Sequence, residues 1–547
     1  MGIVSRWKAS DLGQEFTGPL LAVCGYSGLA GAGFGWDNCY WAGFLGMNKF
    51  AEDFGVFDAA TGTYSIPASW QSAGSGAPTA GVALGCLFSG LVGQRLGRIR
   101  TFFLAAIIAV IGILIQVCSF GHFWQLMAGR IVNSISMGLV CNVVPTYQSE
   151  VSPAKIRGSL INIYQFCKTE FLCKVDQRLT RSEGQLVGAT MACVANWGLQ
   201  SRTDQWAYRP TLMIQFIVPV VLITGGFFLP ESPRWLIGRG RVEEARKVLH
   251  FLRRGTPIAL IDEELNLLVQ AENQDHELYL HTSWIHVFRG SNLRRTLISA
   301  GVQCLQQAQG SGFIVAYSVV FLQTIGVTNS FEILIYLYMV NCLSSVLAFH
   351  FVDRIGRRAL MIGGAVLLAV CMFVLAGLTG FHGSDPGAQK GALACLFVWQ
   401  FVQAISWASC VWIVCAEVPT LAVREKTVTV ATFSGFSTGV LITFVSPFIQ
   451  DSGYGNLQGK IAFVWGAGSI IAAIWAIFML PELKGRTLEE LDELFQKKVG
   501  VFEFGKYHTT GAGATLAVIE GLAHQADDKT AELVVREKGL DRKDGLL

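Results

Sequence analysis

Charged residues are scarce in this sequence. Asp, Glu, Lys and Arg make up 15% of its 547 residues, whereas 52% are hydrophobic. A soluble chain carries charge at roughly 25% of its positions. The composition therefore excludes an ordinary soluble domain and indicates a chain that crosses a lipid bilayer many times.

Several kinds of chemical site are also missing. The net charge of +3 gives no support for nucleic-acid binding. Most of the 14 cysteines lie in apolar runs, where a thiol behaves as a small hydrophobe, and no His/Cys cluster points to a metal. The sequence has no phosphate-binding loop, no paired carboxylates and no serine–histidine arrangement. We therefore predict no enzyme activity, no metal and no other cofactor.

Apolar stretches long enough to cross ~30 Å of hydrocarbon occur about twelve times. They lie near 19–43, 78–97, 101–119, 123–145, 159–200 (interrupted), 210–229, 295–324, 331–352, 359–381, 392–416, 427–449 and 459–480. A polar, helix-forming segment at 231–293 separates the sixth stretch from the seventh.

Lys and Arg follow every even-numbered span, and such loops remain in the cytoplasm. Both termini are therefore expected inside the cell, with the plasma membrane as the expected location. We predict a cytoplasmic N-terminus at 1–18, a six-helix bundle at 19–230, a cytoplasmic helical linker at 231–293, a second six-helix bundle at 294–481, and a cytoplasmic tail at 482–547 that is weakly structured from 500 onward.

The two halves repeat three loop motifs in the same order. GQRLGRIR (93–100) corresponds to DRIGRR (353–358), SEVSPAKIRG (149–158) to AEVPTLAVREK (416–426), and LPESPRWL (229–236) to LPELKGRTLEELDELF (480–495). Parallel repeats about an axis along the membrane normal are the architecture of major facilitator carriers. The predicted fold is an all-α membrane protein of 12 transmembrane helices in two six-helix bundles, with a helical segment between them.

These motifs resemble the sugar porter family of the major facilitator superfamily. The matching residues are Gly129, Arg130, Pro145, Tyr147, Glu150, Arg157 and Gly158, with PESPR at 230–234, QQ at 306–307 and DRIGRR at 353–358. The resemblance covers roughly residues 19–495. It implies two helical bundles around a central sugar site that opens alternately to the two sides of the membrane.

Asp37 places a carboxyl group inside span one. A charge at that depth costs about 2.5–3.5 kcal/mol on insertion scales. The resemblance pairs Asp37 with Arg130 and, in proton-coupled members, makes the acid the protonation site. The alternative is a static ion pair that only fixes helix packing.

A sugar offers hydroxyl groups and an apolar ring face, so its site needs amides and aromatic rings. The resemblance implies a substrate site at Gln165, Gln306, Gln307, Gly312, Trp412 and Phe436. Gly312 stands where the family usually has Asn, and Gly435 and Phe436 replace its polar–Trp pair, so these changes remove hydrogen-bonding groups. The substrate is therefore either a mono- or a disaccharide. A lone intramembrane Gln can instead form an interhelical hydrogen bond.

Charged residues on the cytoplasmic side could form salt bridges that close an inner gate. They are Arg95, Glu150, Arg157, Glu231 and Arg234 in the first half and Asp353, Arg354, Arg357, Glu417 and Arg424 in the second. The alternative is that the basic residues only set the topology.

Residues 167–184, CKTEFLCKVDQRLTRSEG, interrupt span five with charges that no membrane helix holds at low cost. The flanks, 160–166 and 185–199, read as one helix when a single Trp replaces this run. We interpret it as a retained intron; the alternative is a genuine insertion that loops out. A translated insert would separate Gln165 from the rest of its helix and impair transport.

These observations predict secondary active transport of a sugar by alternating access, with proton-coupled symport as the preferred mode. The expected partners are the sugar, a proton and the lipid bilayer. A facilitative uniporter with a structural Asp37 is one alternative. A non-transporting sugar receptor is another, although such receptors usually have longer tails.

Overall fold

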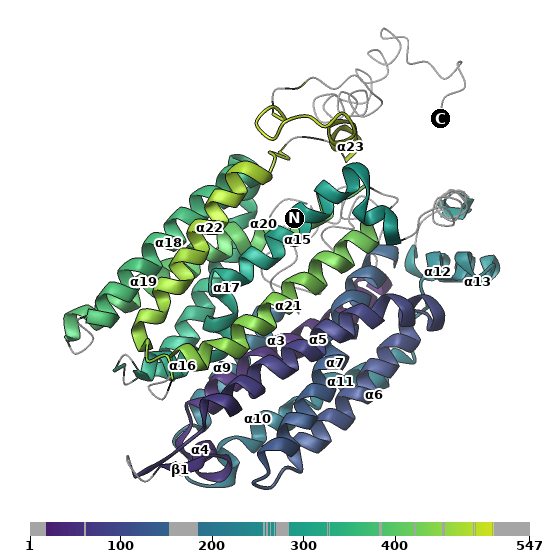
Figure 1. Cartoon of the computed structure of the whole chain (residues 1–547). Helices are drawn as coiled ribbons and strands as arrows, with labels where there is room; N and C mark the ends of the chain where they lie inside the picture. Colours follow the sequence, from purple (N-terminus) through teal and green to yellow (C-terminus); the bar gives the residue numbers. More distant parts are fainter. Residues whose placement is uncertain are drawn as a thin grey trace, which may run out of the picture.

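The computed structural model describes residues 18–58, 62–151, 184–254, parts of 258–269, and most of 284–507. Long helices dominate it and run alongside one another (Figure 1). The first half contains α3 (Gly18–Leu45), α4 (Asn48–Phe54), β1 (Val56–Asp58), β2 (Thr63–Ser65), α5 (Ala68–Leu96), α6 (Arg98–Val117), α7 (Phe123–Val151), α9 (Gly184–Leu199), η2 (Gln205–Ala207), α10 (Arg209–Ile214) and α11 (Ile217–Gly226).

The linker and the second half follow the same helical pattern. The linker contributes α12 (Pro233–Gly238), α13 (Val242–Leu252) and η3 (Trp284–Phe288). The second half contains α15 (Gly290–Ala308), α16 (Ser311–Thr324), α17 (Ser330–Ile355), α18 (Arg357–Phe381), α19 (Pro386–Gln403), the π-helical turn η4 (Ala404–Ala408), α20 (Ser409–Glu417), α21 (Arg424–Gln450), η6 (Gln458–Ile461), α22 (Ala462–Met479) and α23 (Leu488–Gln496).

Within the described residues, seven helical stretches are long and apolar enough to cross a membrane by length and composition alone. They coincide with predicted spans three, four, six, nine, ten, eleven and twelve. Helix α5 differs from its prediction because it begins at Ala68 rather than near 78. Its first turns are rich in Ser and Gly, and Pro78 lies inside it, so the apolar signal begins late. Neighbouring helices and polar side chains make such a proline tolerable in a membrane helix.

Helices α6 and α18 begin in the same way at equivalent places of the two halves. Each follows a glycine with positive φ, Gly97 at 95° and Gly356 at 99°. Glu231 accepts a hydrogen bond from the backbone N–H of Arg98 (2.9 Å), and Glu482 accepts one from that of Arg357 (3.1 Å). The two glutamates thus satisfy backbone donors that a helix N-terminus leaves unpaired. The motif repeat in the sequence has this structural counterpart.

The two ends of the long helices carry different structures (Figure 1). At one end, the hairpin side, lie α4 and an antiparallel hairpin in which Phe57 pairs with Tyr64. At the other end, the linker side, lie α12, α13 and α23. Helices in the linker were expected from the sequence, and the hairpin was not.

The start of the C-terminal tail is packed, so the expectation of weak structure from 500 onward is wrong for the described residues up to Tyr507. Phe504 is fully buried, and Arg486 donates hydrogen bonds to the carbonyl oxygens of Phe504 (3.1 Å) and Tyr507 (2.6 Å). Arg295 anchors α23 by an ion pair with Asp492 at 2.7 Å. The segment therefore belongs to the folded second half, at least as far as Tyr507.

The halves meet along α5 and α21, and they are closed together on the hairpin side. A hydrophobic cluster there combines Trp41, Phe44 and Phe50 of the first half with Val319 and Ile335 of the second. Burying apolar side chains from both halves in one cluster stabilises this closed arrangement. Polar contacts add to it, because Gln323 donates to the carbonyl oxygen of Gly46 at 3.1 Å.

Candidate functional site

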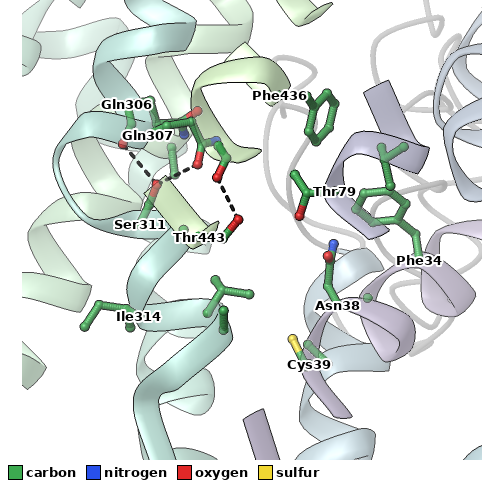
Figure 2. A pocket seen from close by; sticks show the side chains of 18 of the residues that line it. Phe34, Asn38, Cys39, Thr79, Gln306, Gln307, Ser311, Ile314, Phe436 and Thr443 are labelled. Carbon is green, nitrogen blue, oxygen red and sulfur yellow. Dashed lines mark hydrogen bonds between the residues drawn. The ribbon is translucent and has the colours of Figure 1, made fainter. Parts of the chain in front are cut away.

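A cavity of about 320 Å³ lies between the two halves. Helices α3, α5, α7 and α9 line one wall, and α15 to α17 and α19 to α21 line the other. Figure 2 shows Asn38 and Thr79 of the first half facing Gln306, Gln307 and Ser311 of the second. A cleft between two bundles with polar groups on both walls can hold a small polar molecule.

The cavity brings together most of the site residues that the sequence suggested. It is lined by Asp37, Arg130, Gln306, Gln307, Gly312, Trp412 and Phe436. Gln165, the remaining predicted contact, lies outside the described residues. Their roles in binding and coupling stay predictions, but their positions around one cavity fit those roles.

A break in the seventh span places the two glutamines. Helix α15 ends at Ala308, Gly310 has φ +94°, and α16 starts at Ser311. The Ser311 hydroxyl donates to the carbonyl oxygen of Gln306 (3.0 Å) and to Oε1 of Gln307 (3.4 Å). The hydroxyl thereby satisfies a backbone group freed by the break and orients the Gln307 amide toward the cavity. Adjacent residues point about 100° apart on a helix, so both amides reach the cavity.

The positive φ of Gly310 allows a close approach by the twelfth span. A Cβ at Gly310 would lie 2.8 Å from Cγ of Trp465 in α22. Glycine is therefore needed at the break for its backbone conformation and for the space beside the indole.

Asp37 and Arg130 are both buried at the cavity, with 6% and 4% of their surface exposed. Asp37 Oδ1 accepts a hydrogen bond from Asn133 Nδ2 at 2.8 Å. The Arg130 guanidinium lies over the rings of Trp41 (4.0 Å) and Tyr40 (5.1 Å), and its Nε and Nη1 atoms have no hydrogen-bond partner. The expected direct ion pair between Asp37 and Arg130 is thus not formed in this structure. Instead, the arginine makes cation–π contacts with the two aromatic rings, and the carboxyl group of Asp37 accepts its hydrogen bond from an amide.

The cavity also contains amides that the sequence analysis did not single out. They are Asn38, Gln303, Asn341, Gln400 and Gln403. Helical spacing gave a usable signal for some of them, because Gln303 lies one turn before Gln306 on α15. The Gln400–Gln403 pair has the same one-turn spacing on α19. Asn38 directly follows Asp37, and its side chain is exposed to the cavity.

The linker-side charges of the first half pair differently from the prediction. Arg98, rather than the predicted Arg95, forms a two-point ion pair with Glu150, at 2.6 Å and 3.0 Å. The chain turns at Gly97, so Arg98 starts a new helix and leaves the face on which Arg95 lies. Arg95 is exposed and accepts a hydrogen bond from Arg239 through its backbone oxygen.

Glu231 forms no ion pair in the described structure but caps α6 with backbone hydrogen bonds. Burial raises the pKa of the Glu231 carboxyl group, and the backbone N–H groups of Ser232, Arg98 and Ile99 partly oppose that rise. Arg234 has no ion-pair partner among the described residues, and Arg157 lies outside them.

In the second half, Arg357 pairs with Glu417 at 3.2 Å. The charge cluster of each half therefore contains an Arg–Glu bridge and a helix-capping glutamate. Arg354 is exposed, and its carbonyl oxygen accepts from Lys484 at 2.5 Å. Arg424 begins α21, and the Asp353 side chain lies outside the described residues. The two bridges lie within their own halves, so they brace each bundle rather than join the two.

Comparison with known proteins identifies the family. The sequence profile of the family described as "Sugar (and other) transporter" matches residues 23–495. The chain belongs to this family. It is accordingly a membrane transporter and not an enzyme.

Curated relatives cover most of the chain. A major facilitator-type transporter of Aspergillus rugulosus, ecdD, is 30% identical over 91% of this chain and 91% of its own length. The low-affinity glucose transporter HXT3 of Saccharomyces cerevisiae is 28% identical over 87% of this chain and 82% of its own length. The high glucose sensor RGT2 of the same yeast is 31% identical over 76% of this chain but 53% of its own length.

The inward-open structure of the xylose transporter XylE from E. coli superposes with a TM-score of 0.69 at 22% identity. The match covers 87% of this chain and 99% of that chain. This likeness confirms the predicted fold, a major facilitator arrangement of 12 transmembrane helices in two six-helix bundles.

Proposed function

We propose that this sugar transporter couples the movement of a sugar to that of a proton, in symport through the central cavity. The observation that carries the proposal is the meeting of sugar-type ligands and a buried acid in one cavity between two bundles. We place both termini and the linker side in the cytoplasm, as the Lys and Arg of the loops favour, and the protein in the plasma membrane.

Sugar recognition is supported by the chemistry of the two walls. Gln306 and Gln307 can donate to and accept from sugar hydroxyls, and the Trp412 indole offers an apolar face to a ring. A glucose transporter and a glucose sensor are among the relatives, which is consistent with a hexose as one substrate.

Proton coupling is supported by the position of Asp37. Among the described residues that line the cavity, it is the one carboxyl group. Asn133 is its hydrogen-bond partner, and the Arg130 guanidinium is close by but stacked on aromatic rings. Protonation would remove a charge whose burial is costly and leave the arginine uncompensated, which can bias the equilibrium between two bundle arrangements. A structure of a proton:xylose symporter is among the structural neighbours, in agreement with such a mechanism.

The test compares Asp37→Asn with the full chain in cells that lack other sugar uptake. The full chain should alkalinise the medium when sugar is added and should accumulate sugar above its outside concentration. Asp37→Asn has nearly the same shape but cannot exchange a proton, so alkalinisation and accumulation should disappear while equilibrating uptake remains. The control is Asp385→Asn, the same chemical change at an exposed residue whose carboxylate caps the N-terminus of α19.

The outcomes separate the rival functions. Sugar uptake without alkalinisation in the full chain would indicate a uniporter, in which the bond from Asn133 holds Asp37 as a structural residue. Sugar signalling without uptake would indicate a receptor, the function for which the yeast sensor is named.

A further inference from the structure

Two amides on α19, Gln400 and Gln403, line the cavity without an assigned role. Gln403 is 93% buried, with 7% of its surface exposed. Across the described part of the chain, no residue hydrogen-bonds either side-chain amide. An amide placed in a membrane bundle normally bonds to a neighbouring helix, because leaving it unpaired is costly. Two such amides, one turn apart and open to the same cavity, point to a polar ligand.

The π-helical turn η4 explains why these amides face the cavity together with Trp412. In an uninterrupted α-helix, Gln400 and Trp412 would point about 120° apart. A π turn inserts one extra residue, which reduces this angle to about 20°. The same insertion moves Gln403 from the side opposite Trp412 to within about 80° of it. The Ser409 hydroxyl stabilises the turn by donating to the carbonyl oxygen of Ala404 at 2.7 Å.

The part of this span that lines the cavity is longer than a single sugar ring. Gln400 and Trp412 lie about 16 Å apart along the helix axis, from a rise of 1.5 Å per residue with the extra residue of the π turn left out. A pyranose ring with its hydroxyls spans about 7 Å, because its bonds are about 1.5 Å long. Helix α17 packs against both α19 and η4, and it adds Asn341 and Ser345 to the same wall. Together with Gln306 and Gln307 on α15, the cavity offers more amides than one ring uses.

We propose that Gln400 and Gln403 form a second sugar subsite, so that the transporter accepts a disaccharide. One ring packs on Trp412, and the hydroxyls of the other bond to the two amides of α19. Gly312 lines the same cavity, and a Cβ there would lie 3.3 Å from Gln307 Oε1, so the glycine leaves room for that amide beside the sugar. The proposal rests on the proposed function of the central cavity as the sugar site.

The experiment measures competition for uptake in cells that express the full chain. Labelled glucose is the probe, and glucose, maltose, cellobiose, lactose and sucrose are the unlabelled competitors. At least one disaccharide should compete at concentrations about tenfold or more below those of glucose. Gln400→Leu and Gln403→Leu should each raise its half-inhibitory concentration by about 10- to 100-fold, because a buried sugar hydroxyl loses its partner. The value for glucose should change less than about threefold, within the range of one weak hydrogen bond.

Two further variants guard against loss of folding. Gln403→Asn retains an amide on a shorter side chain and should restore part of the disaccharide affinity. Gln125→Leu makes the same polar-to-apolar change at the outer start of α7, away from the cavity, and should leave both competition curves unchanged. Surface abundance of each variant is measured in parallel.

Two results would overturn the subsite: glucose uptake that no disaccharide inhibits, or an equal loss of glucose and disaccharide affinity in the leucine variants. A different result would overturn the proposed function itself, namely a full chain that reaches the surface yet takes up neither class of sugar.

Discussion

Gly97 and Gly356 hold the chain at the points where α6 and α18 begin. Both have a positive φ, and a Cβ would lie 2.5 Å from Glu231 Oε2 at the first and 2.7 Å from Glu482 Oε2 at the second. An alanine at either position would therefore both strain the backbone and displace the capping glutamate. We expect Gly97→Ala and Gly356→Ala each to cost about 1–3 kcal/mol of stability and to lower the melting temperature of the purified protein in detergent.

Two glycines of α18 provide the matched control. A Cβ added at Gly363 or at Gly377 would meet no atom within 4 Å, and both residues have an ordinary helical φ. Alanine at either position should leave stability unchanged or raise it by about 0.5–1 kcal/mol, because alanine is the better helix former. Equal melting temperatures for all four variants would contradict the requirement for glycine at the two helix starts.

The family resemblance was enough to suggest part of the candidate site. Asp37, Gln306 and Gln307 were suggested from the sequence, and all three line the cavity. Arg98 was missed because a helical period carries no information about the turn at Gly97, which moves Arg98 and Arg95 onto different helices. Gln403 was missed for a related reason, since the π turn after it changes which face of the span meets the cavity.

The elements were predictable where their apolar pattern is continuous. Helix α6 and helix α18 agree with the expected spans to within a few residues, because lipid-facing apolar residues fill their whole length. The hairpin of β1 and β2 could not be predicted, because each strand has three residues. The two aromatic side chains that pair across it, Phe57 and Tyr64, are exposed. Strands that short leave no alternation to recognise.

The charged run at 167–184 lies within the predicted fifth span. Of that span the structure describes helix α9, Gly184–Leu199. The run ends at Gly184, which is the first residue of α9. Replacing 167–184 by a single Trp joins the apolar flanks into one stretch, so we expect at least a severalfold higher yield of folded protein and higher sugar uptake. Fluorescence-detected size-exclusion chromatography and uptake assays measure the two quantities.

A scrambled 167–184 segment in the same place is the control, because it keeps length and charge but not sequence. It should behave like the full chain if the run only interrupts the helix. The interpretation as a retained intron would have to be given up if the shortened protein were less well folded or less active than the full chain. Sequencing the mature transcript tests it independently.

The whole molecule is held in a state closed on the hairpin side. The hydrophobic cluster and the bond from Gln323 to Gly46 join the halves there, and the Cys39 thiol donates to the Tyr338 hydroxyl across the same interface at 3.0 Å. Alternating access requires these contacts to separate when the cavity opens toward the hairpin side. Residues at this interface should therefore control the balance between the two states without touching the sugar.

Gly46 offers the sharpest test of this closure. A Cβ at Gly46 would lie 2.3 Å from Val319 Cγ1 of the other half, and Val319 is fully buried. Gly46→Trp should therefore block closure; a penalty of about 3 kcal/mol shifts a two-state equilibrium about 150-fold. We expect uptake to fall at least tenfold, while Cys39, which is buried in the closed state, becomes reactive toward a membrane-impermeant maleimide. Mass spectrometry identifies the labelled cysteine.

Gly198→Trp is the control, because a Cβ there meets no atom within 4 Å, and it should change neither uptake nor the labelling of Cys39. Reduced uptake with Cys39 still protected would show that the substitution damages the fold rather than the equilibrium, and the hairpin-side cluster would then not be the moving interface.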